Sequence, residues 1–394
     1  MKITVAVMFG SRSVEHEISI ISAVQAMAAV TNARYNLLPI YITKQGEMRT
    51  GTALFDIKNY KNLADLSQKL TPIIFVKNQV FAIVKGKIAK KPMAKIDVAI
   101  PITHGTFGED GTIQGFLEFN QIPYAGCDIA ASAIGMDKVH FKNLLKSADL
   151  PVLNGVSFTK REYNLNKDEI AEKIVQTCDF PCIVKPANLG SSVGISKVDD
   201  VKSLANSIEQ ATLLADKILV EPCVTSLREI NCAVLGDADE QIVSVLEEPI
   251  SSDEILSFKD KYQSSSSSKN NAQSAGMASL ARKIPAEIDD VKRDEIQDLA
   301  RKVFCAIGAS GVARIDFLVD CNDGEKVYVN EINTIPGSLS FYLFDKIEID
   351  YNTLIEKLIE LALKRERVRK SLNFSYDTNI LSGKINLGSK GSKG

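Results

Sequence analysis

Residues 311–337 have the sequence GVARIDFLVDCNDGEKVYVNEINTIPG, which predicts a β-hairpin. Two runs of β-forming residues flank the dipeptide Asp323-Gly324. Aspartate and glycine both tolerate the positive φ of a tight two-residue turn between antiparallel strands. If this turn closes the hairpin, Asn322 pairs with Glu325, and the register of the whole strand pair follows by counting outward.

This register brings two carboxylates face to face. It places Asp316 opposite Glu331 and Arg314 opposite Asn333, all on one face because strand side chains alternate. Two unit charges about 5 Å apart at an effective dielectric constant of about 20 repel by roughly 3 kcal/mol. Because opposed like charges destabilise a strand pair, a bound cation is the simplest explanation. Two carboxylates and an amide are hard oxygen ligands that suit Mg²⁺.

An amphipathic hairpin with its charges in water is the alternative explanation for one Asp-Glu pair. The predicted register puts Leu318 and Val329 on the same face, one step nearer the turn. Apolar neighbours on that face indicate that the charged end borders a cleft. We therefore favour a metal site at this end of the hairpin.

Length and composition are ordinary for a soluble protein. The chain has 394 residues, 45% hydrophobic and 24% charged, which is enough for two or three domains with separate cores. A formal net charge of −2 argues against a nucleic-acid partner. With no 18-residue apolar span and no signal-peptide pattern, we expect a cytoplasmic protein without membrane contact. Seven cysteines without CxxC spacing favour reduced thiols over a zinc site.

The first part of the chain has the pattern of an open α/β domain. Its predicted elements are a strand over 3–8, a helix over about 17–30 and a strand over 35–42. A further strand, 96–102, runs into the glycine-rich sequence HGTFGEDGTIQGFLEF, and ligands gather at such carboxyl ends. A helix and short strands then indicate an α+β region, so we expect a domain boundary near residue 130.

A loop between two strand-like runs is a candidate phosphate site. The sequence is CIVKPANLGSSVGISKV, residues 182–198, in which glycines let backbone amides approach an anion. Ser191 and Ser192 add hydroxyl donors, and Lys185 could meet a phosphate oxygen. The chain has neither the Walker sequence GxxxxGK[ST] nor the Rossmann sequence GxGxxG. An ordinary turn with a solvated lysine explains the same residues, so both interpretations stay open here.

Two further segments could belong to the same site. The apolar run LVEPCV, residues 219–224, contains Glu221 at an edge where a carboxylate could contact adenine and ribose, while Glu229 equally fits a surface position. The serine-rich segment 263–276 cannot easily form a core, and a loop of this length is a lid or disordered. Lys261 and Tyr262, directly before it, favour a lid.

Taken together, Lys138, Lys185, the GSSVGI loop, Glu221, RID and NEINTIPG resemble an ATP-grasp enzyme. With FGSRSVEHEIS and HGTFGEDGTIQG added, the chain resembles the D-alanine–D-alanine ligase family from residue 1 to about 365. The resemblance implies an ATP-grasp fold of α/β and α+β class with an N-terminal open α/β (pre-ATP-grasp) domain. Its regions would be an N-terminal α/β domain (1–130), a central lobe (131–223), a C-terminal lobe (224–365) with the lid (258–283), and a disordered tail (366–394).

The family's reaction joins two D-alanines through an acyl phosphate, and the resemblance assigns roles to the residues that match its motifs. ATP and two Mg²⁺ ions, with Mn²⁺ as an alternative, would be the cofactors. The metal ligands would be Asp316, Glu331 and Asn333. ATP would contact Lys138, Lys185, Ser192 and, once the lid closes, Lys261, with Glu221 and Glu229 at adenine and ribose. Arg314 and the backbone N–H of Gly337 would stabilise the tetrahedral oxyanion.

The resemblance also places both substrates. Glu15 would pair with the ammonium group of the first D-alanine and form a hydrogen-bonded triad with Ser191 and Tyr262, although a glutamate at a helix start is also a favourable dipole partner. His104 matches an active-site histidine, although it could equally be a packing residue. The second substrate would meet Tyr342 and Leu343, and relatives are commonly homodimers.

Two features depart from the family pattern, namely the residue at position 342 and a lid that is rich in serine and longer than in compact members. Tyr342 stands where a serine is common, and a phenol changes both the volume and the donor geometry of the second-substrate site. Because Lys261 and Tyr262 are retained, we expect D-alanine as the nucleophile, with D-lactate and D-serine as alternatives. A non-catalytic ATP-binding regulator and another ATP-grasp carboxylate-amine ligase are the remaining hypotheses.

Overall fold

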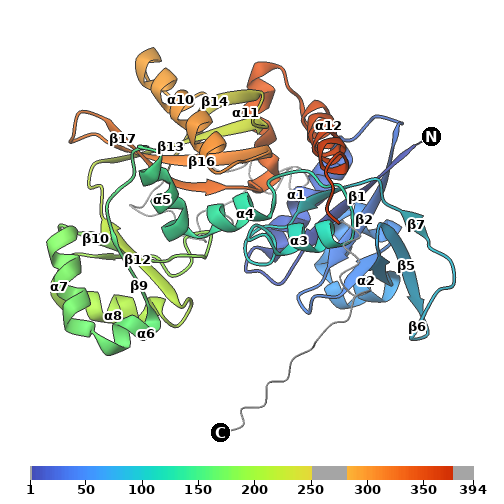
Figure 1. Ribbon diagram of the computed structural model, residues 1–394, viewed down its shortest axis with the longest axis horizontal. Helices are drawn as coiled ribbons and strands as arrows, with labels where there is room; N and C mark the ends of the chain where they lie inside the picture. Colours follow the sequence, from blue (N-terminus) through green and yellow to red (C-terminus); the bar gives the residue numbers. More distant parts are fainter. Residues whose placement is uncertain (1, 251–281, 376–394) are drawn as a thin grey trace, which may run out of the picture.

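The computed structural model describes residues 2–250 and 282–375 and builds them around three β-sheets (Figure 1). The sheet of the N-terminal part lies at one end of the molecule and a four-stranded sheet at the other, with a five-stranded sheet above and between them. Lys261, Tyr262, most of the predicted lid and residues 376–394 of the predicted tail lie outside the described residues.

The N-terminal sheet has the strand order β6-β5-β4-β3-β2-β1-β8, with β7 paired to β5. Strand β1 (Ile3–Gly10) lies in its parallel part, between β2 (Tyr35–Ile42) and β8 (Val98–Ile102). These three strands are nearly continuous apolar runs, as expected where both faces of a parallel sheet are covered. The remaining strands are β3 (Met48–Thr50), β4 (Thr71–Val76), β5 (Gln79–Val84), β6 (Lys87–Ile88) and β7 (Ala94–Lys95). The predicted open α/β start is confirmed.

Helices connect the strands of this sheet and follow its last strand in the chain, β8. The predicted helix over about 17–30 is present as α1 (His16–Ala29), which follows β1 directly. The others are η1 (Thr52–Phe55), η2 (Ile57–Lys61), α2 (Leu63–Lys69), α3 (Thr112–Phe119) and α4 (Ile129–Met136). Helix α5 (Lys138–Ser147) begins immediately after α4, because Asp137 caps its free backbone N–H groups at Val139 and His140.

The four-stranded sheet is antiparallel and has the order β11-β10-β12-β9. Its strands are β9 (Val156–Thr159), β10 (Cys182–Pro186), β11 (Ser196–Val198) and β12 (Lys217–Pro222). Three helices lie against one side of it in Figure 1, namely α6 (Lys160–Leu165), α7 (Lys167–Thr177) and α8 (Val201–Ala211). Apolar residues of these strands and helices form a separate hydrophobic core, which stabilises this unit.

The five-stranded sheet is also antiparallel and has the order β15-β14-β13-β16-β17. Its strands are β13 (Leu227–Gly236), β14 (Gln241–Pro249), β15 (Arg282–Lys283), β16 (Gly311–Asp320) and β17 (Lys326–Asn333). The helices of this region are α10 (Asp290–Ala306), η5 (Gly337–Ser340), α11 (Phe341–Phe344), η6 (Asp345–Ile347) and α12 (Tyr351–Lys370). Helix α12 continues to Lys370, so residues 366–370 of the predicted tail are helical.

The predicted hairpin is present, but its turn differs from the prediction. Asp320 pairs with Lys326, so five residues form the turn, and Asn322 does not pair with Glu325 as a two-residue turn requires. The register then shifts next to Asp316, where Asn330 is the extra residue of β17. This β-bulge offsets the longer turn. The predicted pairs at the charged end are therefore correct, whereas Leu318 faces Tyr328 and not Val329.

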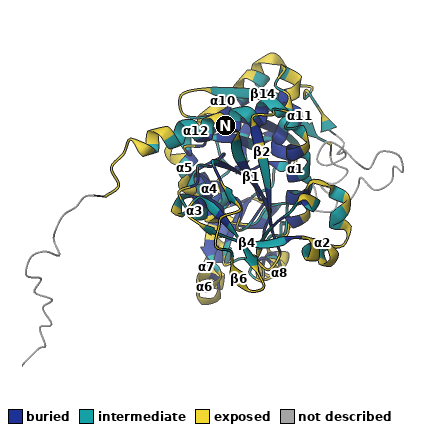
Figure 2. Ribbon diagram, turned by 90° about the vertical axis from the view of Figure 1, so that its right-hand side faces the viewer, coloured by how far each residue is buried: buried dark blue, intermediate teal, exposed yellow. Residues whose placement is uncertain are grey.

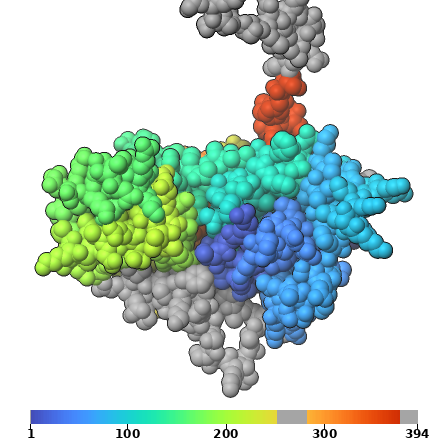
Figure 3. Space-filling view, turned by 90° about the horizontal axis from the view of Figure 1, so that it is seen from below, coloured from blue at the N-terminus to red at the C-terminus, as the bar shows by residue number. Residues whose placement is uncertain are grey.

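The N-terminal and C-terminal parts share one hydrophobic core. Apolar side chains of β1, α1 and β8 pack in a single cluster with those of β13, α11 and α12. Figure 2 shows this buried interior in dark blue, and Figure 3 shows the chain near residues 100–140 between the N-terminal part and the four-stranded sheet. Within the described ranges, no helix is long and apolar enough to span a membrane.

Candidate active site

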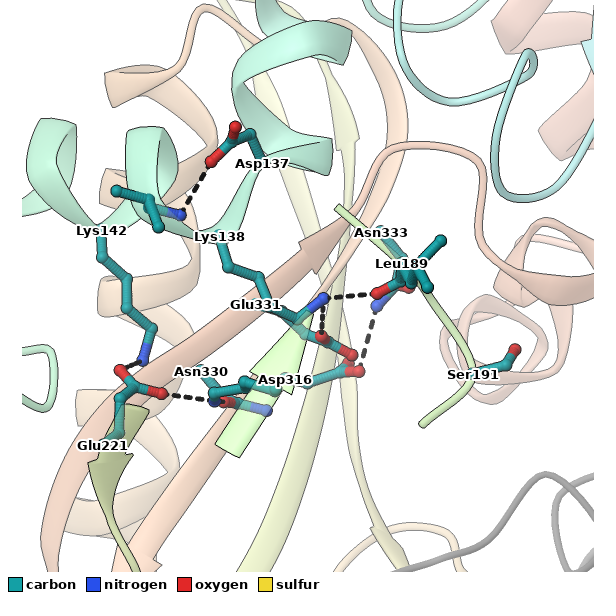
Figure 4. A network of polar contacts seen from close by, with 12 residues as sticks. Asp137, Lys138, Lys142, Leu189, Ser191, Glu221, Asp316, Asn330, Glu331 and Asn333 are labelled. Atoms are coloured by element: carbon teal, nitrogen blue, oxygen red, sulfur yellow. Dashed lines mark hydrogen bonds and ion pairs between the residues drawn. The ribbon is translucent and has the colours of Figure 1, made fainter. Parts of the chain in front are cut away.

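The two opposed carboxylates lie at the end of the β16–β17 pair. Asp316 faces Glu331, and Arg314 faces Asn333, as the sequence predicted. Asn333 donates a hydrogen bond from Nδ2 to Oδ2 of Asp316 over 3.0 Å, and Nζ of Lys138 lies 3.2 Å from Oε2 of Glu331. Figure 4 shows these side chains converging. The protein's own cations therefore relieve part of the repulsion that suggested a metal.

Arg314 binds Asp316 through two parallel hydrogen bonds. Its Nε donates to Oδ1 over 2.7 Å and its Nη2 to Oδ2 over 2.8 Å. Burial disfavours the guanidinium charge, but the adjacent Asp316 carboxylate outweighs burial and raises the pKa of Arg314 well above its ordinary value. Arg314 is thus a fixed positive charge paired with Asp316.

The predicted phosphate residues line a single cavity of about 540 Å³. Lys138, the first residue of α5, donates from Nζ to the backbone oxygen of Leu189 over 2.8 Å, which ties it to the glycine-serine loop. The other residues with predicted ATP contacts that line the cavity are Lys185, Ser192, Glu221 and Glu229. Its volume is in the range of sites for small molecules and cofactors. The phosphate-cradle interpretation is therefore favoured over an ordinary turn.

Glu221 is buried between two lysines. Lys142 contacts its Oε1 and Lys185 contacts its Oε2. Burial alone would raise the pKa of this carboxyl, but the two ammonium charges outweigh it and lower the pKa. Lys142 was missed by the sequence analysis. A signal existed, because Lys142 is four residues after Lys138 and so lies on the same face of α5.

Glu15 links the N-terminal part to the glycine-serine loop. The Ser191 hydroxyl donates a hydrogen bond to Oε1 of Glu15, so two members of the predicted triad meet. Glu15 also lines a small cavity with Lys138, Glu331 and Asn333. Its position beside Glu331 of the carboxylate pair suits the binding of a ligand group between the N-terminal part and strand β17.

A second buried glutamate lies beside Glu15. Glu109 lines the same small cavity, and its pKa is raised to about 8, first by burial and then by the charge of Glu15. Its glycine-rich loop was predicted to be functional, but Glu109 was not among the predicted site residues. A glutamate among glycines at the carboxyl end of a strand was the available signal.

The remaining predicted residues lie on or against the segment that follows β17. His104 is buried, with its ring nitrogens 2.8 Å from the backbone oxygen of Ile335 and 2.9 Å from Oγ of Ser22. Gly337 begins η5. Tyr342 donates its hydroxyl hydrogen to Oε2 of Glu247 over 3.1 Å. Leu343 belongs to the shared hydrophobic core.

Known proteins resemble the chain over nearly its full length. Family models described as D-ala D-ala ligase N-terminus and C-terminus match residues 4–127 and 144–360. A D-alanine–D-alanine ligase of Thermosipho melanesiensis is 39% identical over 390 residues, which are 97% of this chain and 99% of the relative. One of Caldicellulosiruptor bescii is 40% identical over 385 residues, covering 95% and 99%.

Solved structures agree with the sequence comparison. The D-alanine-D-alanine ligase from Coxiella burnetii has a TM-score of 0.77 at 26% identity, covering 94% of this chain and 96% of that one. The VanG D-Ala:D-Ser ligase from Enterococcus faecalis has a TM-score of 0.76 at 29% identity, covering 92% and 100%. The three-sheet fold is that of an ATP-grasp ligase. The chain belongs to the D-alanine–D-alanine ligase family.

Proposed function

We propose that this member of the family joins two D-alanines in an ATP-dependent reaction that supplies a precursor of peptidoglycan. The γ-phosphoryl group of ATP passes to a carboxylate oxygen of the first D-alanine, which gives ADP and D-alanyl phosphate. The amine of the second D-alanine then attacks the carbonyl carbon. A C–N bond forms, the C–O bond to phosphate breaks, and phosphate leaves as the amine loses its proton.

One observation carries this proposal. The cavity of about 540 Å³ is lined by Lys138 and Lys185 and by the carboxylate of Glu331 at one end. A carboxylate is a poor electrophile, and its activation brings several negative centres together. A site that places two buried ammonium groups beside a carboxylate cluster suits that task. The small cavity with Glu15 adjoins the same end, which supports a place there for the first D-alanine's ammonium group.

The chemistry of the proposed metal ligands suits Mg²⁺. Asp316, Glu331 and Asn333 supply two carboxylates and an amide oxygen, the hard ligands that Mg²⁺ prefers. Two bound ions, Mg²⁺ or Mn²⁺, would neutralise charge on the β- and γ-phosphates. The amide of Asn333 donates through Nδ2 to Asp316, and its oxygen is the atom that can ligate a cation.

The chain's own residues would orient and stabilise the reacting groups. Lys138 and Lys185 would hold the phosphates, while Glu221 and Glu229 would contact adenine and ribose. Glu15 would bind the first substrate, supported by Ser191 and, when the lid closes, by Tyr262. Arg314 and the N–H of Gly337 would stabilise the oxyanion, because fixed donors aimed at developing charge need no reorganisation. Lys261 would contact the γ-phosphate.

The surroundings of Tyr342 bear on the identity of the second substrate. Tyr342 is held by Glu247, and the Arg282 guanidinium lies 4.7 Å from the centre of its ring. The similarity to a D-Ala:D-Ser ligase supports D-serine as an alternative nucleophile, alongside D-lactate. A cytoplasmic location and a homodimer complete the proposal by resemblance.

Phosphate release tests the function. The protein should release phosphate from ATP only with D-alanine and Mg²⁺, and mass analysis should identify D-alanyl-D-alanine. Adding D-serine or D-lactate in separate reactions tests the alternatives through the mass of the mixed product. Nucleotide binding without turnover with any D-amino or D-hydroxy acid would favour the non-catalytic regulator instead.

A further inference from the structure

The segment after β17 holds an unusual backbone conformation. Ser338, Leu339 and Ser340 are three consecutive non-glycine residues with φ values of 50°, 54° and 51°. The left-handed region costs roughly 1–2 kcal/mol for each such residue. Such strain persists where the surrounding structure fixes the backbone, and it clusters at active sites. This segment directly follows Gly337, so its conformation bears on the proposed oxyanion site.

The glycine-rich loop after β8 forms hydrogen bonds with both the N–H and the carbonyl oxygen of Ile335. Its N–H donates to Oε1 of Glu109 over 3.0 Å, and its carbonyl oxygen accepts a hydrogen bond from Nδ1 of His104 over 2.8 Å. The other oxygen of Glu109 accepts from the N–H of Gly105 over 2.8 Å, which fixes the carboxylate to its own loop. All these contacts are buried.

Helix α1 holds the same segment through hydrogen bonds to Ser338. The N–H of Ser338 donates to Oγ of Ser22 over 3.0 Å, and the same Oγ lies 2.9 Å from Nε2 of His104. The side chain of Ser338 reinforces this by donating to Oε1 of Gln25 over 2.7 Å. Gly337 therefore lies between two backbone positions, at Ile335 and Ser338, that the N-terminal part holds.

The hydrogen bonds assign the ring tautomer of His104. A carbonyl oxygen can only accept, so Nδ1 carries the hydrogen. Burial lowers the pKa of His104 to about 4, so the ring is neutral near pH 7 and Nε2 is an acceptor. The Ser22 hydroxyl then donates to Nε2 while its oxygen accepts from Ser338. Both ring nitrogens of His104 and the Ser22 hydroxyl therefore have matching partners.

We propose that His104 is a positioning residue that, with Ser22 and Glu109, clamps segment 335–340, in which residues 338–340 are strained, and so aims the backbone N–H of Gly337. The inference rests on the proposed function only for the role of Gly337. Both ring nitrogens bind protein atoms, so His104 acts through the backbone of this segment and not by direct contact with a substrate.

The clamp has a kinetic signature. A donor aimed at the oxyanion acts in the transition state, so its displacement lowers kcat and leaves the KM values nearly unchanged. A misplacement of about 1 Å can cost about a hundredfold in rate. A residue that bound substrate directly would change KM as well.

Paired substitutions separate the two ring nitrogens. An asparagine amide reaches as far as Nδ1 and can still donate to Ile335, whereas a glutamine amide reaches as far as Nε2. We expect His104→Gln and Ser22→Ala to lower kcat by about tenfold to a hundredfold, and His104→Asn to retain about ten times more activity than His104→Gln. Ser147→Ala is the matched control, because that exposed hydroxyl donates within its own helix, and its kcat should equal wild type.

Nitrogen NMR of the imidazoles tests the clamp without turnover. The chain has three histidines, so the signals are few and His104→Asn assigns one of them. We expect His104 to be neutral with hydrogen on Nδ1 from about pH 6 to 8. A hydrogen on Nε2, or equal kcat in His104→Asn and His104→Gln, would overturn the proposal. Wild-type protein without D-alanine-dependent phosphate release would instead contradict the proposed function and leave the NMR result to decide the clamp.

Discussion

Lys142 forms a buried ion pair with Glu221, and neither side chain is more than 5% exposed. Lys185 binds the other oxygen of the same carboxylate, so Glu221 is held from two elements, α5 and β10. Of these three residues, Lys185 and Glu221 line the cavity of about 540 Å³ and Lys142 does not, so Lys142 lies behind the other two. Burial lowers the pKa of Lys142 to about 8, but its contact with the carboxylate favours the charged form. Lys142 therefore supports the nucleotide site without lining it.

Lys142→Met should weaken nucleotide binding. Without Lys142, Glu221 is held by Lys185 alone, and Lys185 is drawn away from the phosphates it would contact. We expect the dissociation constant of a non-hydrolysable ATP analogue with Mg²⁺ to rise by about tenfold, equivalent to about 1.4 kcal/mol. Isothermal titration calorimetry measures it. Lys146→Met, an exposed lysine of the same helix, is the control, and equal affinities in the two variants would refute the supporting role.

Loss of either opposed carboxylate should stop turnover without unfolding the protein. Asp316→Asn and Glu331→Gln keep the side-chain shapes, but they replace one acceptor oxygen with an NH2 donor and remove a negative charge that a divalent cation needs. We expect kcat to fall by about a hundredfold or more. Steady-state phosphate release measures the rate, and circular dichroism checks the fold. Activity within a few-fold of wild type in both variants would show that this pair does not hold the metal.

Removing the Ser191 hydroxyl should affect the first substrate. Ser191→Ala takes away the hydrogen bond that orients Glu15 across the gap between the glycine-serine loop and the N-terminal part. We expect the KM for the first D-alanine to rise by about tenfold, because a hydrogen bond to a charged group contributes about 1.5–3 kcal/mol. Initial rates over a range of D-alanine concentrations measure the change. An unaltered KM would place the D-alanine ammonium group elsewhere.

The free energy of unfolding should depend on pH through the protonation of the Glu221 carboxylate. Its pKa is lowered in the folded protein, because the ammonium groups of Lys142 and Lys185 outweigh burial. The stabilisation is therefore fully present above the ordinary pKa of 4.5 and is lost as the pH falls through the lowered value. Urea unfolding of wild type and Glu221→Gln between about pH 6 and pH 3 tests this. The difference between the two should shrink on acidification, and a constant difference would contradict the assignment.

The pairing at the charged end of the hairpin was predicted correctly, because the structure differs from the prediction in two ways that cancel. The turn is longer than predicted, and a β-bulge shifts the register back. Asp323-Gly324 suggested a two-residue turn, and the real turn is longer. Asn330 is inserted as a β-bulge, which restores the pairing of Asp316 with Glu331. Periodicity cannot locate such a bulge, because a single extra residue has no sequence signal of its own. The bulge has a consequence for the site, since Oδ1 of Asn330 lies 3.4 Å from Nζ of Lys185.

Residues that act through tertiary contacts were harder to predict. Local sequence identified Lys185 and the glycine-serine loop, because their residue types suit an anion, and the family resemblance added Lys138. Lys142 lies on a helix face whose partner, Glu221, comes from a distant strand. Glu109 and Ser22 gain their roles from backbone groups more than two hundred residues away. Such pairings depend on how the sheets pack, which local pattern does not specify.

Oxygen transfer tests the central claim most directly. If the carboxylate of the first D-alanine attacks the γ-phosphoryl group, one of its oxygens leaves with the phosphate when the second amine displaces it. Turnover with D-alanine labelled with ¹⁸O in the carboxylate, followed by mass analysis of the released phosphate, should show one labelled oxygen in each phosphate. Unlabelled phosphate would contradict the account, because it would mean that ATP is hydrolysed by water and the carboxylate is never activated.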